Sequence, residues 1–174
     1  LKELSFSLKN KNKKNHIIAS NEGAAVSIGI GNYLSTKKIP VIYMQNSGLS
    51  NALNPLISIA HKKVYSIPLI LIIGWRGSPR VKDEPQHDVK GKITEQILKL
   101  LNIKYTILRS NSDINKFDKQ IKLAKKNKSI IACLIEQGTL EKSTNIKKKQ
   151  DFYNLDKELF LKKILKNLNK KTKI

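Results

Sequence analysis

An uninterrupted apolar run, Pro68-Leu-Ile-Leu-Ile-Ile73, constrains the fold of this chain most strongly. Its length is typical of a β-strand, and its lack of polar alternation is typical of a central strand in a parallel sheet covered on both faces. Three further strand-like segments occur at residues 39–44, 105–108 and 130–135. They alternate with helical periodicity at residues 22–34, 47–61, 93–101 and 114–126. This alternation predicts an α/β fold, a parallel sheet of at least four strands flanked by helices.

The chain length and the composition along it predict one compact domain followed by a basic extension. Residues 1–137 carry all the predicted strands, and residues 138–174 are expected to form a basic linker and a helix at 155–168. That helix has an apolar stripe, which would pack on its own domain or on a partner. The chain starts at Leu1 without a methionine or a signal peptide, so we expect its N-terminus to be truncated. No apolar run approaches the roughly 20 residues that span a bilayer, so we expect no membrane association.

The basic charge of the chain does not by itself indicate a nucleic-acid partner. The formal net charge is +21, but only Arg76, Arg80 and Arg109 are arginines, so that 31 of the 34 basic residues are lysines. Proteins that read nucleic acids interleave arginine with aromatic residues, and this sequence has no such stripe. We therefore expect no specific nucleic-acid binding, only weak adhesion that salt would reverse. The single cysteine, Cys133, lies in an apolar segment, which predicts buried packing and a cytoplasmic location.

A series of short motifs between Ser20 and Thr94 carries the strongest functional signal. In chain order the motifs are Asn21-Glu-Gly-Ala-Ala25, Tyr43-Met-Gln-Asn-Ser-Gly-Leu-Ser-Asn-Ala52, Asn54-Pro-Leu56, Tyr65-Ser-Ile-Pro68, Ile73-Gly-Trp-Arg-Gly77 and Lys82-Asp-Glu-Pro-Gln-His87. Their order and spacing resemble the first domain of the phosphonopyruvate decarboxylases, which are thiamine-diphosphate-dependent 2-oxoacid decarboxylases. The resemblance continues more faintly to about Glu136.

This resemblance implies a thiamine-diphosphate-binding fold, of which the chain holds the pyrimidine-binding domain only. It also implies thiamine diphosphate and Mg2+ as cofactors, a small anionic 2-oxoacid as substrate, and a homo-oligomer. The diphosphate and magnesium site is expected in a separate domain or a second subunit, and none of these 174 residues is expected to bind metal. The absence of a glycine-rich phosphate loop from the sequence agrees with that expectation.

Glu22 is the predicted catalytic residue and also a cofactor contact. The resemblance implies that Glu22 hydrogen-bonds the aminopyrimidine ring and so promotes loss of the thiazolium C2 proton. The small residues that follow it, Gly23-Ala-Ala25, would let a flat ring approach the start of a helix. A simpler alternative is that Glu22 is an acidic helix-start residue favoured by the helix macrodipole.

The turn after the predicted strand at 39–44 supplies the other expected cofactor contacts, namely Asn46, Ser47, Gly48 and Asn51. The resemblance places this turn against the pyrimidine, and Gly48 would allow close approach of the backbone. Alternatively, Asn46 or Ser47 caps the following helix and Asn51 bonds to the start of its own helix.

The predicted loop from Gly74 to Gly91 carries His87 as a catalytic and substrate-binding candidate and Arg76 as a substrate-binding candidate. A histidine transfers protons near neutral pH, and an arginine suits a substrate phosphonate. Arg76 would otherwise anchor the loop by pairing with Asp83 or Glu84. His16 and His61 match no motif and are expected at the surface.

The resulting functional prediction is decarboxylation of 3-phosphonopyruvate to phosphonoacetaldehyde and CO2, as part of a larger enzyme and not by this chain alone. One alternative is the first subunit of a sulfopyruvate decarboxylase. A second alternative, from a different class, is a non-catalytic basic binding module.

Overall fold

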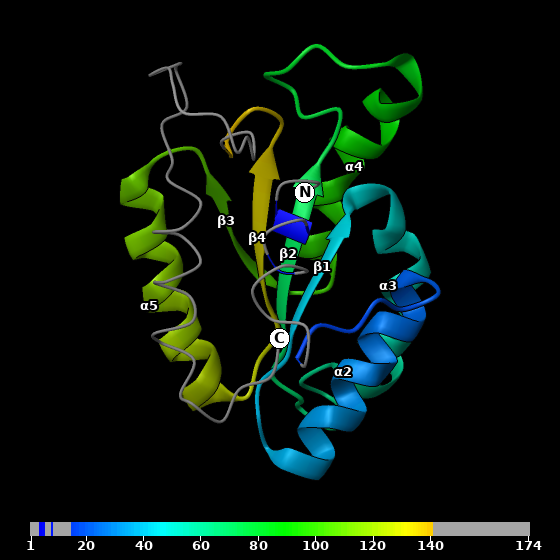
Figure 1. The fold of residues 1–174 in the computed structure, drawn as a ribbon, viewed down its shortest axis with the longest axis vertical. Helices are drawn as coiled ribbons and strands as arrows, with labels where there is room; N and C mark the ends of the chain where they lie inside the picture. Colours follow the sequence, from blue (N-terminus) through cyan, green and yellow to red (C-terminus); the bar gives the residue numbers. More distant parts are fainter. Residues whose placement is uncertain (1–3, 6–7, 9–14, 141–174) are drawn as a thin grey trace.

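A computed structural model describes residues 4–5, 8 and 15–140 of the chain and contains a four-stranded, all-parallel sheet in the order β1-β2-β4-β3. The strands are β1 (Val41–Gln45), β2 (Ile70–Trp75), β3 (Lys104–Leu108) and β4 (Ile131–Glu136). All four arrows point to the same edge of the sheet, where β1 leads into a tight turn and β2 into a longer loop (Figure 1). This confirms the predicted α/β fold with a parallel sheet flanked by helices.

The helices cover both faces of this sheet. One face carries α2 (Glu22–Thr36), α3 (Leu49–Pro55) and α4 (Pro85–Leu100), and the other carries α5 (Asn111–Asn127). A 3-10 turn, η1 (Asn46–Gly48), leads into α3, and a π-helical turn, η2 (Leu56–Ala60), ends it. Within the described part of the chain, no helix is long and apolar enough to cross a membrane.

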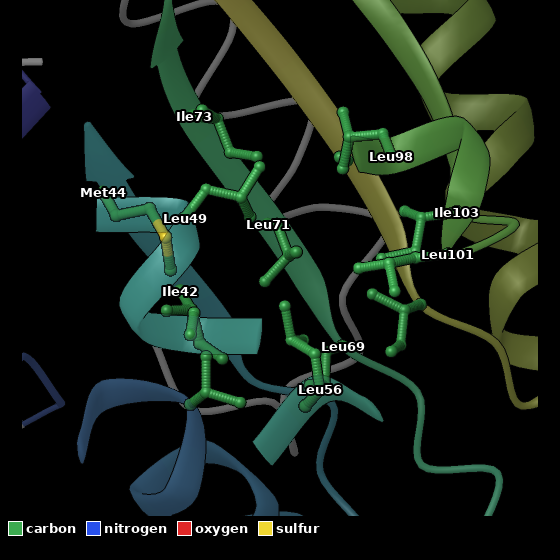
Figure 2. Packing of buried hydrophobic residues seen from close by; sticks show 14 of the residues in the cluster. Ile42, Met44, Leu49, Leu56, Leu69, Leu71, Ile73, Leu98, Leu101 and Ile103 are labelled. Carbon is green, nitrogen blue, oxygen red and sulfur yellow. The ribbon is translucent and has the colours of Figure 1, made fainter. Parts of the chain in front are cut away.

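The apolar run that predicted a central strand is buried on both sides. In β2, the side chains of Leu71 and Ile73 pack with α3 and α4, whereas Ile70 and Ile72 pack with α5. Figure 2 shows the first of these cores, where residues of β1, β2, α3 and α4 meet. This two-sided burial explains why the run contains no polar residue.

The second core buries the lone cysteine. Cys133 in β4 is fully buried beside Phe117 and Ile121 of α5, and this burial raises the pKa of its thiol. A buried thiol with a raised pKa is a poor nucleophile, so Cys133 serves packing, as the sequence predicted.

The main difference from the sequence prediction lies between Gly74 and Gly91. This segment was expected to be a loop throughout, with a short helix from Ile93, but α4 already begins at Pro85. A proline at the first position of a helix is favourable because its fixed φ suits the helix and its missing N–H would have had no partner. Because mostly polar residues follow Pro85 and a glycine, Gly91, lies inside the helix, apolar periodicity does not reveal this helix start. Leu140, three residues after the boundary predicted at residue 137, is buried in the second core. The segments at 142–149 and 155–168 lie outside the described residues.

Candidate active site at the carboxyl edge of the sheet

Glu22 lies at the start of α2, with its carboxylate against the turn that follows β1. The cap of α2 is its neighbour Asn21, whose side-chain Oδ1 accepts a hydrogen bond from the backbone N–H of Ala24 at 2.8 Å. The Nδ2 of Asn51, in α3, donates to Oε2 of Glu22 at 3.1 Å. Asn21 caps the helix, and Glu22 is the acidic residue of its first turn, a position that also agrees with the macrodipole alternative. Its carboxylate in addition joins α2 to α3.

Gly48 makes this position of the carboxylate possible. A Cβ atom on Gly48 would overlap the carboxyl carbon and Oε1 of Glu22. Gly23 has a similar role between the helices, because a Cβ there would approach the backbone oxygen of Asn51 to 2.9 Å. The structure therefore brings Glu22, Gly48 and Asn51 together, as the sequence predicted, through close packing of α2 on α3.

Neither Asn46 nor Ser47 caps α3. No side chain caps η1 or α3. The hydroxyl of Ser47 donates to Oε1 of Gln45 at 3.0 Å, and Ser47 remains half-buried. The capping alternative for these two residues is therefore wrong.

Asn46 points into the protein and not towards a ligand. Its side-chain Nδ2 donates to the backbone oxygen of Arg76 at 2.9 Å and to Oγ1 of Thr94 at 3.0 Å. Its Oδ1 accepts from the backbone N–H of Arg76 at 3.1 Å, and Asn46 is only 5% exposed. The predicted cofactor contact of Asn46 is therefore not available to its side chain, because both amide protons are already used inside the domain.

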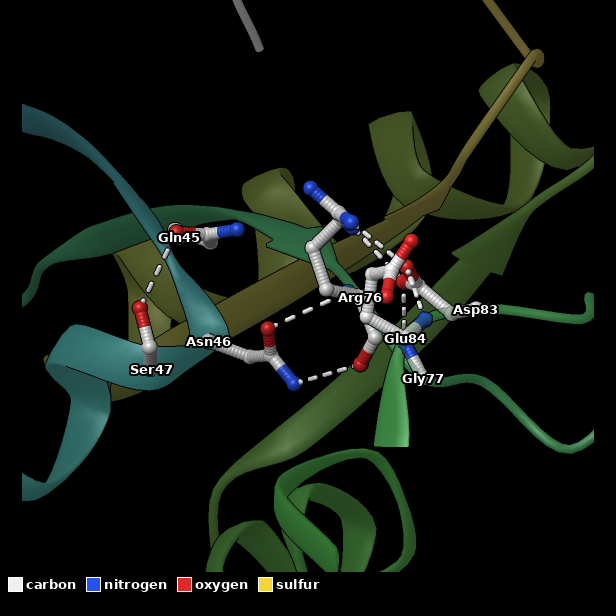
Figure 3. Close-up of polar contacts among 7 residues, drawn as sticks. All are labelled: Gln45, Asn46, Ser47, Arg76, Gly77, Asp83 and Glu84. Carbon is white, nitrogen blue, oxygen red and sulfur yellow. Dashed lines mark hydrogen bonds and ion pairs between the residues drawn. The ribbon is translucent and has the colours of Figure 1, made fainter. Parts of the chain in front are cut away.

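Arg76 is held by Asp83 in the loop after β2. Its Nε donates to Oδ2 of Asp83 at 2.6 Å and its Nη2 donates to Oδ1 at 2.5 Å. Figure 3 shows this two-point contact beside the hydrogen bonds between Asn46 and the backbone of Arg76. The backbone N–H groups of Gly77 and Glu84 also donate to Asp83. This guanidinium holds the pKa of the Asp83 carboxyl well below its usual range, and Asp83 in turn raises the pKa of Arg76. The geometry matches the loop-anchor alternative for Arg76.

His87 lies in the first turns of α4 and not in a loop, which corrects the sequence prediction. It is half-buried, and α4 is packed so closely on the end of β2 that a Cβ on Gly77, where φ is +67°, would overlap the backbone oxygen of His87. A Cβ on Gly91 would likewise overlap the backbone oxygen of Gly77, and Nε1 of Trp75 donates to the backbone oxygen of Gly91 at 2.9 Å. These contacts fix the position of His87 relative to the end of β2.

Two features of this region were not predicted. Thr94 is buried and hydrogen-bonded to Asn46. The only sequence signal for its burial is its helical spacing from Gly91 and Leu98, which are buried as well. His16, expected at the surface, is half-buried and stacks on Tyr43 with ring centroids 5.6 Å apart, and its Nε2 lies 2.6 Å from the Tyr43 hydroxyl. No sequence motif marked this contact.

A cavity of about 410 Å³ lies beside the edge strand, between β1, α2 and residues 15–22. Of the predicted site residues, only Glu22 lines it, so the cavity does not coincide with the turn at 46–51 or with His87. Among the described residues, no group of three or more His, Cys, Asp or Glu side chains is arranged to hold a metal ion.

Comparison with known proteins gives consistent results. The family described as "Thiamine pyrophosphate enzyme, N-terminal TPP binding domain" matches residues 2–99. Over 98 residues, 56% of the chain, the sequence is 36% identical to the phosphonopyruvate decarboxylase of Streptomyces viridochromogenes and 35% identical to that of Streptomyces hygroscopicus, covering 24% of each relative. Over 90 residues it is 36% identical to sulfopyruvate decarboxylase subunit alpha of Methanococcus maripaludis, covering 52% of each chain.

These matches confirm the resemblance predicted from the motifs, although they span only a quarter to about half of the relatives' length. Because the family match covers more than half of the 174 residues, the chain belongs to the thiamine pyrophosphate enzymes, as an N-terminal TPP binding domain.

Proposed function

We propose that this chain supplies the pyrimidine-binding half of a thiamine-diphosphate-dependent decarboxylase of the phosphonopyruvate or sulfopyruvate type. The observation that carries the proposal is the placement of the Glu22 carboxylate, half-buried at a helix start, over a glycine and within hydrogen-bonding distance of Asn51. The family match and the names of the relatives support the same reading.

The residues around Glu22 fit an aminopyrimidine ring. Asn51 donates to Oε2 of the carboxylate, and the ring nitrogen is proposed to meet this same carboxylate. When bound, thiamine diphosphate supplies a thiazolium that accepts the electron pair left by departing CO2. The proposed role of Glu22 is to hold a proton and to share it with the pyrimidine nitrogen. Gly48, which lies next to that carboxylate, and its chain neighbour Ser47 are the proposed backbone and side-chain contacts of the ring.

His87 is the proposed proton donor and acceptor for the substrate, because an imidazole changes protonation near neutral pH. Arg76 is proposed to contribute positive charge near the substrate, but mainly to hold the loop through Asp83, since Nε and Nη2 are both engaged there. Mg2+ and the diphosphate would be bound by another domain or subunit, and the enzyme would be a homo-oligomer or a pair of different subunits in the cytoplasm.

We propose phosphonopyruvate as the substrate, supported by the Trp75-Arg76 motif and the Lys82-to-His87 motif. Sulfopyruvate is the second candidate, because relatives with that name match over a similar length. The two substrates differ in charge, since a phosphonate carries close to two negative charges and a sulfonate carries one. Comparing kcat/KM for the two compounds with the complete enzyme decides between them, and a higher value for sulfopyruvate would contradict phosphonopyruvate as the substrate.

The decisive experiment on the site is Glu22→Gln in the complete enzyme, assembled with its diphosphate-binding domain or subunit. Glutamine keeps the size of the side chain and still hydrogen-bonds a ring nitrogen, but it cannot give up or take a proton. We expect turnover to fall by about a hundredfold or more, the usual scale for loss of a proton-transfer group. Exchange of the C2 proton of bound thiamine diphosphate should slow in parallel.

Glu95→Gln is the matched control, because Glu95 accepts a hydrogen bond from the Tyr105 hydroxyl at 2.6 Å and takes no part in the proposed site. We expect near-normal turnover from this variant. If the Glu22→Gln enzyme keeps normal turnover and C2 exchange, the catalytic assignment of Glu22 is wrong.

A further inference from the structure

The buried carboxamide of Asn46 connects three parts of the carboxyl edge of the sheet. Asn46 immediately follows β1, and its side chain reaches both the backbone N–H and the backbone oxygen of Arg76 after β2, and the hydroxyl of Thr94 in α4. Gly48, which lies under the Glu22 carboxylate, is two residues further along the same 3-10 turn. One side chain therefore links the Glu22 half of the candidate site to the half that carries His87.

Thr94 extends this link along α4. Its hydroxyl accepts from Asn46 Nδ2 and donates to the backbone oxygen of Lys90 at 2.6 Å, so both its hydrogen-bonding directions are used. Lys90 lies three residues after His87 in the same helix. The Asn46–Thr94 bond thus holds the middle of α4 to the residue that follows β1, while Gly77 and Trp75 hold the preceding turns against the end of β2.

An uncharged amide matches the hydrogen-bonding groups around this position. The Nδ2 group faces two acceptors, the Arg76 backbone oxygen and the Thr94 hydroxyl oxygen, and the Oδ1 atom faces a donor. An aspartate of the same shape would place a second oxygen against those acceptors in a site that is 5% exposed, where an unmatched polar group is costly.

We propose that Asn46 is a positioning residue, which sets the place of the His87-bearing helix α4 relative to Glu22 while touching neither cofactor nor substrate. The inference rests on the proposed function, since it assumes that Glu22 and His87 act in one site. Removing the link lets α4 shift on the sheet, so that the proton step assigned to His87 slows and the proton step assigned to Glu22 continues at its normal rate.

The test uses the complete assembled enzyme with phosphonopyruvate as substrate. Thr94→Val removes the hydroxyl that accepts from Asn46 and keeps the side-chain volume nearly constant. Thr94→Ser keeps the hydroxyl. Thr106→Val is a control variant at another buried threonine, in β3. We expect Thr94→Val to lower kcat by about tenfold and to change KM little, because His87 would be only partly misplaced. Exchange of the thiamine C2 proton should be unchanged, whereas amide hydrogen exchange in residues 85–94 should become faster and that in α5 should not. Thr94→Ser and Thr106→Val should behave like the wild type, and Asn46→Asp should show a larger effect than Thr94→Val.

A double-mutant comparison separates positioning from general loss of stability. If Thr94 acts through His87, adding Thr94→Val to a His87→Ala enzyme should cause no further loss of kcat. Losses that simply multiply, a normal kcat for Thr94→Val, or unchanged amide exchange in α4 would each overturn the proposal. A wild-type enzyme that decarboxylates neither substrate, with C2 exchange insensitive to Glu22→Gln, would instead overturn the proposed function itself, and with it this role.

Discussion

Replacing Gly48 by alanine tests whether the position of the Glu22 carboxylate matters, with little disturbance to the fold. The backbone of Gly48 has φ −86° and ψ −7°, a right-handed conformation that alanine adopts without strain. The added methyl group would overlap both the carboxyl group and Cγ of Glu22, so the Glu22 side chain must change its conformation. The Glu22 carboxylate must therefore move, while the backbone is free to stay in place.

The expected change in stability is small because the contributions oppose one another. A glycine-to-alanine change at a compatible position stabilises a protein by about 0.4–1 kcal/mol through the unfolded state. Losing the exposed hydrogen bond from Asn51 costs about 1 kcal/mol. The free energy of unfolding should thus change by no more than about 1 kcal/mol. Catalysis should fall by about a hundredfold, the loss typical of a reacting group displaced by about 1 Å.

The assay measures turnover, exchange of the thiamine C2 proton and thermal unfolding of the same complete enzyme. Gly31→Ala is the matched control, because Gly31 is exposed in α2 and a Cβ there would meet nothing within 4 Å. This control should gain about 0.5–1 kcal/mol of stability and keep its activity. A Gly48→Ala enzyme with normal turnover would show that the close contact between Glu22 and the turn has no catalytic value.

Two further predictions concern the loop anchor and the core. The Asp83 carboxylate, whose pKa is lowered by Arg76, stabilises the fold above the ordinary aspartate pKa of about 3.9, and this stabilisation is lost as the pH falls through the lower pKa of the folded state. Between neutral pH and about pH 2, the Tm of Asp83→Asn should therefore fall less steeply than that of the wild type. An equally steep fall of Tm would contradict the anchor role. Cys133, the single cysteine of the chain, should resist a thiol reagent in the native protein and react on unfolding, because it is fully buried and its thiol pKa is raised. Fast labelling of the folded protein would disprove that burial.

The local sequence was sufficient for the elements whose formation depends on neighbouring residues. The apolar run at 68–73 predicted a central strand because a strand buried on both faces cannot carry polar side chains. The helix after Asn21 was predicted because small and apolar residues follow at helical spacing, and its observed cap, Asn21, is equally local. The motifs also identified Glu22, Gly48 and Asn51 as one group, and the structure brings these three together.

Contacts between distant residues were decided only by tertiary packing. Asn46 looked like a helix cap or a cofactor contact, but its partners lie 30 and 48 residues away, and no local pattern specifies them. The early start of α4 depends on Gly77 and Gly91, which let the helix approach the end of β2 more closely than any side chain would allow. The sequence therefore predicts a loop at His87, whereas the structure has a helix there. Hydrophobic period and capping act over a few residues and can be read in order along the chain, whereas a buried hydrogen bond or a glycine contact exists only once the sheet has brought its strand ends together.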